Sequence, residues 1–75
     1  MEVIVFGPLI DIIGIDRYDE LEISNTDQLK RQLLALYPSI SVVPFAIAVN
    51  SEIIHENTLL TKDDRVALLP PFSGG

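Results

Sequence analysis

The chain has 75 residues, 48% hydrophobic and 21% charged, a composition typical of one globular domain rather than of a disordered segment. Eleven acidic residues against five basic ones give a net charge of −6, which excludes a nucleic-acid backbone as the expected ligand and favours a partner with a basic surface. The apolar runs are too short to cross a bilayer and there is no cysteine, so we expect neither a membrane span nor a disulfide or thiol chemistry.

The first third of the sequence predicts two paired strands with a short helical turn between them. Residues 2–6 (EVIVF) are apolar and β-branched and stop at a Gly-Pro pair, as strands commonly do. Residues 9–14 predict the helical turn, ended by Gly14, and residues 17–23 predict the second strand. Because no basic leader precedes the first apolar run, we expect a strand there rather than a signal peptide, and hence a cytoplasmic protein.

One longer helix is predicted next. Asn25 is a suitable N-cap residue, and Gln28 stands three residues further on, as in a capping box. An apolar stripe follows at helical spacing and stops at a proline; its members are Leu29, Leu33, Leu36 and Tyr37. We expect this stripe to pack on one face of the sheet.

The second half of the chain predicts three more strands. Residues 45–50 (FAIAVN) and 52–54 (EII) are expected to form a hairpin, although its Asn-Ser turn lacks the usual second glycine. Residues 58–64 predict a turn region and residues 65–69 (RVALL) the last strand. The element order predicts a single α+β domain over residues 1–75 with a β-grasp arrangement. In that arrangement one main helix covers a mixed sheet of four to five strands, with the first and last strands side by side at its centre.

Side chains suited to catalysis or metal binding are few and isolated. His55 is the only histidine and has no second histidine or acidic cluster at ligand spacing, so we expect a surface residue. Asp63 and Asp64, next to Lys62 and Arg65, are typical of a solvated turn rather than of a metal pair. No serine has a general base at a recognisable spacing, and no glycine-rich loop leads into a helix, so no metal, nucleotide or internal active site is expected.

The unusual feature is the end of the sequence, PPFSGG. No charged side chain follows Arg65, so this segment can enter a protein channel with only its terminal carboxylate to desolvate. Two stiff prolines, an apolar anchor and a slender end follow one another: Pro70, Pro71, Phe72, Ser73, Gly74 and Gly75. We therefore expect residues 70–75 to be an extended, functional tail; an ordinary frayed terminus is the alternative.

The strands before the tail have two apolar faces. If the larger side chains of residues 45–49 and 66–68 face the helix, the residues between them face away. These outward residues are Ala46, Ala48, Ala67 and Leu69. Small residues leave a flat surface beside Phe72, and an exposed apolar face on a small acidic domain is typical of a partner interface. A sheet covered on both faces is the alternative, but the sequence predicts only one main helix.

Four segments carry a family resemblance: the first strand with the GID that follows it, the helix ending in LYP, the AVNSEII hairpin and the ending LTKDDRVALLPPFSGG. Together they resemble the small subunit of molybdopterin synthase, a ubiquitin-like sulfur carrier, over nearly the whole chain. The double proline is the specific part, because the thiamine-pathway carrier shares the diglycine but not usually the prolines. Two positions depart from the family pattern: Asp63 replaces the glycine of a DGD turn, and the short helix lacks an arginine.

The resemblance implies that Gly75 is the reactive residue. In the family, an enzyme similar to ubiquitin-activating enzymes uses ATP and Mg²⁺ to convert the terminal glycine to an acyl-adenylate, and displacement by sulfur leaves a thiocarboxylate. The tail then enters the large synthase subunit, where the sulfur passes to a cyclic pterin precursor. By position, Gly75 carries the sulfur, Ser73 and Gly74 thread the channel, and residues 70–72 set the exit.

The resemblance also implies a non-catalytic subunit that binds no cofactor of its own. Its partners would be the large synthase subunit, the adenylating enzyme and a sulfur-donating enzyme, with a two-plus-two assembly of small and large subunits. Three alternatives stay open from the residues: a carrier for another pathway such as that of thiamine, a ubiquitin-like modifier joined through Gly75 to a lysine of a target protein, and a plain binding domain whose tail has no role.

Overall fold

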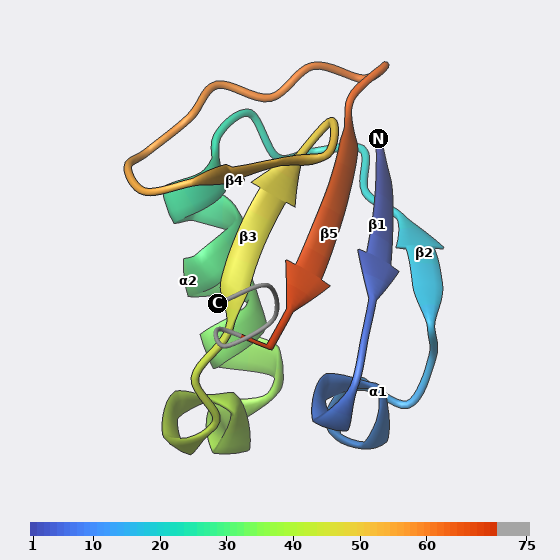
Figure 1. The fold of residues 1–75 in the computed structure, drawn as a ribbon, viewed down its shortest axis with the longest axis vertical. Helices are drawn as coiled ribbons and strands as arrows, with labels where there is room; N and C mark the ends of the chain where they lie inside the picture. Colours follow the sequence, from blue (N-terminus) through green and yellow to red (C-terminus); the bar gives the residue numbers. More distant parts are fainter. Residues whose placement is uncertain (71–75) are drawn as a thin grey trace.

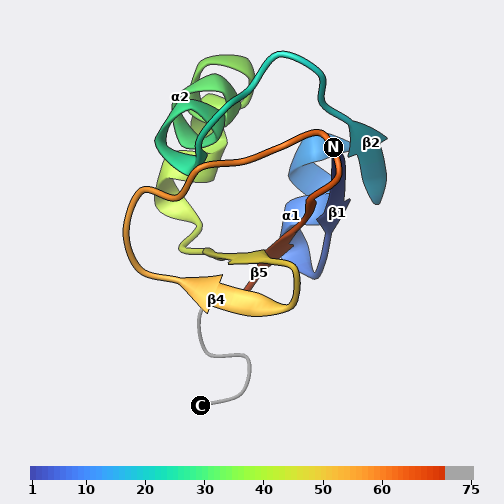
Figure 2. The same cartoon turned by 90° about the horizontal axis from the view of Figure 1, so that it is seen from above.

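The structure, a computed structural model that describes residues 1–70, is a five-stranded mixed sheet with strand order β2-β1-β5-β3-β4 (Figure 1). The helices lie on one face of this sheet (Figure 2). The two-layer α+β architecture and the β-grasp arrangement are therefore confirmed. The strands are β1 (Glu2–Val5), β2 (Arg17–Asp19), β3 (Ala46–Val49), β4 (Glu52–Ile54) and β5 (Arg65–Leu69).

The first and last strands form the centre of the sheet. β1 and β5 run parallel, with Val3 opposite Val66 and Val5 opposite Leu68, and these side chains are buried. β2 joins the outer side of β1 and β3 the outer side of β5, both antiparallel, and β4 returns antiparallel along β3. These valine and leucine side chains meet without access to solvent, so β1 and β5 form the middle of the core.

The core is closed by two α-helices and a 3₁₀-helix on the same face. They are α1 (Pro8–Ile13), α2 (Thr26–Leu36) and η1 (Pro38–Val42). Each contributes buried side chains to one cluster with the strands: Leu9 and Ile13 from α1, Leu29 and Leu33 from α2, and Ile40 from η1. The sequence pattern did not predict η1. The main helix does end before Pro38, as expected, and Pro38 then begins η1, as proline does at a first helical position.

The start of α2 matches the expected capping. The side-chain oxygen of Asn25 accepts a hydrogen bond of 2.8 Å from the backbone N–H of Gln28, and the Gln28 side chain accepts one of 2.9 Å from Ser24. Leu29 and Leu33 are buried and Tyr37 packs on the core, but Leu36 is 61% exposed, so its predicted place in the core was wrong. Leu36 lies one helical turn beyond Gln32, on the flank of α2 that borders β2 rather than on the face above the sheet.

Element boundaries differ most at β2. The strand ends at Asp19 and not at residue 23: Glu20 still exchanges two backbone hydrogen bonds with Met1, and the chain then turns away from β1 towards α2. The predicted turn region at residues 58–64 has no strand, yet Leu60 is buried and Leu59 forms an isolated bridge with Asn25.

Among residues 1–70, no helix is long and apolar enough to span a membrane.

Candidate functional site

The described chain ends at Pro70, directly after the central strand β5. Here the N–H of Phe6 donates a hydrogen bond of 3.1 Å to the carbonyl of Leu68, which holds the two strand ends together. Gly7 follows with φ 61° and ψ −142°, a backbone conformation that is essentially restricted to glycine. A Cβ added at Gly7 would lie 3.1 Å from Cγ of Pro70, so the loop before α1 and the exit of the chain are in close contact. Gly7 thus fixes the position of Pro70, the last residue that the structure describes.

Most of the predicted tail lies outside the described residues. Of the six tail residues, the structure places Pro70, which is half-buried against Gly7. The roles predicted for Pro71, Phe72, Ser73, Gly74 and Gly75 remain predictions. Sequence reasoning did not identify Gly7 as part of the site; the Gly-Pro pair was interpreted only as the end of a strand.

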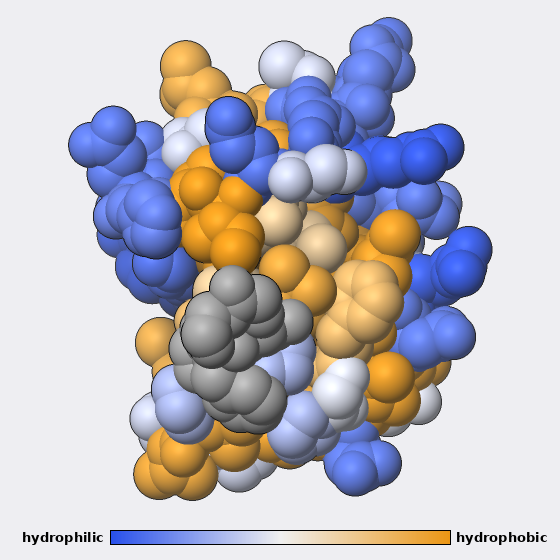
Figure 3. Space-filling view, in the orientation of Figure 1, coloured by the Kyte–Doolittle hydropathy of each residue, from blue (hydrophilic) through white to orange (hydrophobic). Residues whose placement is uncertain are grey.

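The outward orientation of the alanines is confirmed by the strand register. Ala46 lies opposite Leu69, and Ala48 opposite Ala67, while Ile47 and the other inward residues are buried under the helices. The row that contains Ala48 and Ala67 continues onto the neighbouring strands, so we define the sheet face by Ile4, Ala46, Ala48, Ile53, Ala67 and Leu69. Hydrophobic residues gather over the central strands on this side of the molecule, with hydrophilic residues at its margins (Figure 3).

The sheet face is flat, apolar at the end beside Pro70 and charged at the opposite end of the strands. Ala48 is only 3% exposed between its neighbours, and Ala46, Ala67 and Leu69 are half-buried, so no long side chain rises from the middle. At the opposite end of β1 and β5 from the exit, Glu2 lies 3.8 Å from both Arg17 and Arg65 in exposed ion pairs. Such pairs add little stability. They border the face with charge and leave the end beside Pro70 apolar.

The β3–β4 hairpin is closed by a left-handed turn. Asn50 and Ser51 have φ of 51° and 72°, the pattern of a two-residue turn that suits the twist of a hairpin. The Asn50 side chain accepts a hydrogen bond of 3.0 Å from the N–H of Arg65 and donates one of 2.9 Å to Asp64. The turn is therefore tied to the start of the central strand β5.

Asp63 and Asp64 lie in the turn before β5, where Asp64 is held by hydrogen bonds. The Asp64 carboxylate accepts hydrogen bonds from the Asn50 side chain and from the N–H of Thr61, and these lower the pKa of Asp64. Within residues 1–70 the backbone is left-handed only at Gly7, Gly14, Asn50 and Ser51, so the turn does not require glycine at Asp63. The departure from the DGD pattern is thus accommodated without strain.

The remaining candidate side chains are dispersed. His55 is exposed just after β4, as expected for a surface residue. Among the residues that the structure describes, no three histidine, aspartate or glutamate side chains come together to hold a metal ion. The described residues therefore present an apolar sheet face and a defined position for Pro70 directly after β5.

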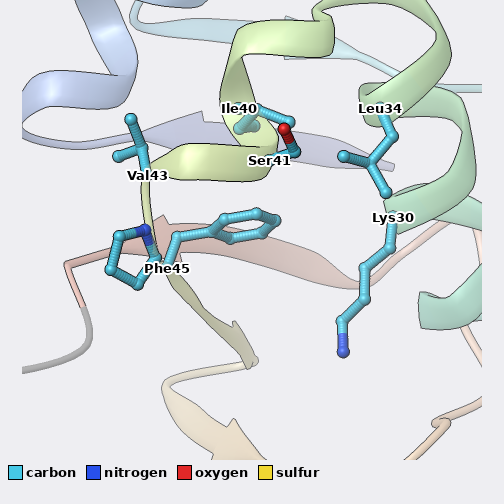
Figure 4. A pocket seen from close by; sticks show the side chains of 7 residues that line it. Lys30, Leu34, Ile40, Ser41, Val43 and Phe45 are labelled. Carbon is cyan, nitrogen blue, oxygen red and sulfur yellow. The ribbon is translucent and has the colours of Figure 1, made fainter.

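Two neighbouring hollows flank α2 on the β4 side. One, of about 370 Å³, is bounded by Leu34, Ile40 and the ring of Phe45, with Lys30 extending away from them at its margin (Figure 4). The other, of about 350 Å³, shares Lys30 and Phe45 and reaches His55. Sequence reasoning did not find either hollow, because each depends on how α2 packs beside a later segment: η1 and the residues up to Phe45 in the first hollow, and β3, β4 and His55 in the second.

Comparison with known proteins shows consistent similarities. A model of the ThiS family matches residues 3–75. Two solved structures of small archaeal modifier protein 1 share the fold. The protein from Methanosarcina acetivorans has a TM-score of 0.78 at 24% identity, covering 99% of this chain and 94% of that one. The protein from Haloferax volcanii has a TM-score of 0.70 at 23% identity, with 100% and 98% covered.

A third solved structure is more similar in sequence. It is a chain in the protein–protein complex of subunits 1 and 2 of molybdopterin-converting factor from Helicobacter pylori 26695. The identity is 31% and the TM-score 0.67, with 99% of this chain and 96% of that one covered. The similarity therefore extends over both chains almost completely.

Proposed function

Because the chain belongs to the ThiS family and has the fold shared by small sulfur carriers and ubiquitin-like modifiers, we propose that it carries sulfur on the terminal carboxylate of Gly75. The observation that carries this proposal is the exit of the chain at Pro70, braced by Gly7 at the end of a central strand and beside the apolar sheet face. A segment that follows a central strand has a defined starting point, and this favours a functional tail over an ordinary frayed terminus.

The proposed chemistry uses the main chain rather than a side chain. A carboxylate is a poor electrophile, so it first attacks the α-phosphorus of ATP on an adenylating partner, with pyrophosphate as the leaving group. Sulfide-level sulfur from a donating enzyme then displaces AMP from the acyl-adenylate and leaves a thiocarboxylate on Gly75. ATP and Mg²⁺ belong to the partner in this scheme. The domain itself acts as a non-catalytic subunit that presents its end.

We assign the carrier to molybdopterin synthesis, as the small subunit of a two-plus-two synthase. Two observations support this choice over a thiamine-pathway carrier. The first is the 31% identity to a chain in the solved complex of subunits 1 and 2 of molybdopterin-converting factor, and the second is the Pro70-Pro71 pair before the diglycine. The sulfur would then pass from Gly75 to a pterin precursor in the large subunit, with residues 71–74 in its channel.

The sheet face is the proposed docking surface for the large subunit and, in turn, for the adenylating enzyme. Small side chains such as Ala46 and Ala67 allow a partner to approach the backbone closely and exclude water, and Leu69 continues the surface to the exit. The net charge of −6 favours basic residues around the matching surface of each partner.

Mass spectrometry of the intact protein from its native cell tests the proposal. We expect a fraction whose mass shows one oxygen replaced by sulfur at the terminus, and loss of this fraction when Gly75 is deleted. Asp63→Gly is the matched control, because position 63 lies in an exposed turn far from the exit and should keep the modification. Finding only unmodified carboxylate, together with full molybdopterin synthesis by the Gly75 deletion, would contradict the proposal.

A variant of the sheet face tests the docking surface separately. Ala67→Asp places a charge in the middle of the face and should weaken binding to the large subunit, measured by calorimetry, about tenfold or more. Leu34→Asp on the helical side is the control and should bind normally. Equal binding by both variants would show that the large subunit docks elsewhere.

Conjugation to other proteins is the second candidate function, favoured by the similarity of the fold to small archaeal modifier protein 1. It needs the same activation of Gly75 but ends in an amide bond to a lysine. The same mass analysis distinguishes the two functions, because conjugation leaves the segment VALLPPFSGG, which follows Arg65, on lysines of other proteins after trypsin digestion. Absence of this segment, with thiocarboxylate present, would leave the carrier function alone.

A further inference from the structure

A third hollow lies on the opposite flank of α2, beside the edge strand β2. Its volume is about 220 Å³, and we define the β2 groove by its lining residues Ile15, Tyr18, Glu20, Gln32, Leu36 and Tyr37. Ile15 is 48% exposed and Leu36 61% exposed, so two large aliphatic side chains stand at its margins in contact with water. The groove is separate from the sheet face, which lies on the other side of the sheet.

The backbone of β2 is open along this groove. Glu20 exchanges hydrogen bonds with Met1, and the N–H of Val5 donates to Asp16, so the even-numbered residues of this strand point their backbone groups at β1. In an antiparallel ladder the residues between them point the other way. The N–H and C=O groups of Arg17 and Asp19 therefore face outward, as the unpaired edge of the sheet.

The groove also contains a polar atom without a partner. The hydroxyl oxygen of Tyr18 is shielded from solvent and has no hydrogen-bond partner among the described residues. Burial, then the nearby Glu20 carboxylate and Tyr37, raise the pKa of Tyr18 to about 12, so the group is a neutral hydroxyl. Tyr18 therefore contributes an uncharged, largely apolar wall to the groove.

The charge around the groove has one sign. Glu20 lines it, and Asp16 and Glu22 lie next to β2. The nearest basic residue on the strand, Arg17, pairs with Glu2 on the sheet face and not on the groove side. This negative rim around an apolar hollow complements a segment that is apolar in the middle and basic at its ends.

We propose that the β2 groove binds an extended segment of a partner protein as a sixth strand, pairing with the backbone of Arg17 and Asp19. A bulky apolar side chain of the segment lies between Ile15 and Leu36, and flanking lysine or arginine residues face the acidic rim. Because the groove and the sheet face lie on different sides, the domain can hold this segment while its tail engages another enzyme. The proposal does not depend on the chemistry of Gly75.

Titration of the isotopically labelled full chain with a synthetic peptide, followed by NMR, tests this. The probe is acetyl-KKTVIVTK-amide, and its controls are the same peptide with every lysine replaced by glutamate and the same peptide with its isoleucine replaced by proline. We expect saturable shifts at the amides of Arg17 and Asp19, with slower solvent exchange of both amides. The acidic peptide should bind more weakly because of the rim, and the proline peptide because it lacks a donor in the ladder.

Two matched variants of α2 sharpen the test. Leu36→Ser should weaken peptide binding about tenfold or more, because the side chain at the margin no longer covers apolar surface. Leu34→Ser, which alters a leucine of 43% exposure that lines a different hollow, should leave the affinity unchanged. Absence of saturable shifts at millimolar peptide, or equal affinities of the two variants, would overturn the proposal. Shifts that depend on protein concentration without peptide would identify a second copy of the chain as the occupant and overturn it too.

Discussion

Replacing Gly7 by alanine perturbs the exit of the chain while leaving the rest of the core in place. Two effects follow from the structure. The backbone at Gly7, with φ 61° and ψ −142°, is strained for any residue with a side chain, and the new Cβ would lie 3.1 Å from Pro70. Gly14 is the matched control: its φ of 89° is also left-handed, but nothing lies within 4 Å of an added Cβ.

The magnitudes of the two substitutions should differ. Alanine at Gly14 adds left-handed strain of about 1–2 kcal/mol. At Gly7 the conformation is less accessible, with a strain of about 1–3 kcal/mol, and Pro70 must also shift by a few tenths of an ångström. We expect Gly7→Ala to lower the free energy of unfolding by about 2–4 kcal/mol. About 1 kcal/mol or more of this loss comes from the clash with Pro70 and disappears if Pro70 moves away. For a domain of this size, each kcal/mol lowers Tm by about 4–8 °C.

Calorimetric unfolding and amide NMR spectra of both variants measure these effects. Gly7→Ala should lose more stability than Gly14→Ala and should shift the amides of Leu68 and Leu69, which Gly14→Ala leaves in place. Gly7→Ala should also slow transfer of sulfur from a thiocarboxylated chain, because the exit is aimed differently. Equal Tm values for the two variants, with unshifted amides at the end of β5, would refute the idea that Gly7 braces Pro70.

Three further predictions concern the hairpin turn, its carboxylate and the buried hydroxyl. Ser51→Gly should raise the free energy of unfolding, measured by urea denaturation, by about 0.5–1 kcal/mol, because the φ of 72° at this position suits glycine. A loss of stability would contradict this. Hydrogen bonds from Asn50 and Thr61 lower the pKa of Asp64 below its ordinary value of 3.8, so the unfolded chain takes up this proton first. The contribution of Asp64 to the stability of the folded state is thus present above about pH 4 and is lost as the pH falls through the lower folded-state pKa. Asp64→Asn should therefore flatten this part of the acid unfolding curve. Tyr18→Phe removes a hydroxyl without a partner among the described residues and should leave Tm unchanged or raise it; a loss above about 1 kcal/mol would mean that the hydroxyl is hydrogen-bonded in solution.

The elements that the sequence predicts well are those with strong local signals. The caps at Asn25 and Gly14, the alternation in residues 65–69 and the Asn-Ser turn all appear in the structure. Each depends on neighbours in the chain, such as a side chain that accepts from an N–H three residues away. The orientation of the alanines also follows from strand alternation alone once the inward residues are known.

The features that sequence reasoning missed depend on contacts between distant segments. Leu36 fits the helical stripe by spacing, but whether that flank meets the sheet or borders an edge strand depends on how α2 is rotated above β2. The contact of Gly7 with Pro70 joins residues at opposite ends of the chain, and no local pattern contains it. The length of β2 likewise follows from where Met1 lies beside Glu20.

The parallel pairing of β1 and β5 also has a mechanical consequence. The strand that leads into the tail is hydrogen-bonded on both sides, to β1 and to β3, along its whole length. A force that draws the tail outward acts along β5 and loads both ladders in shear, so many hydrogen bonds must break together rather than one after another. A force on the last residues therefore meets the resistance of the whole core, so the domain can stay folded while its end is pulled.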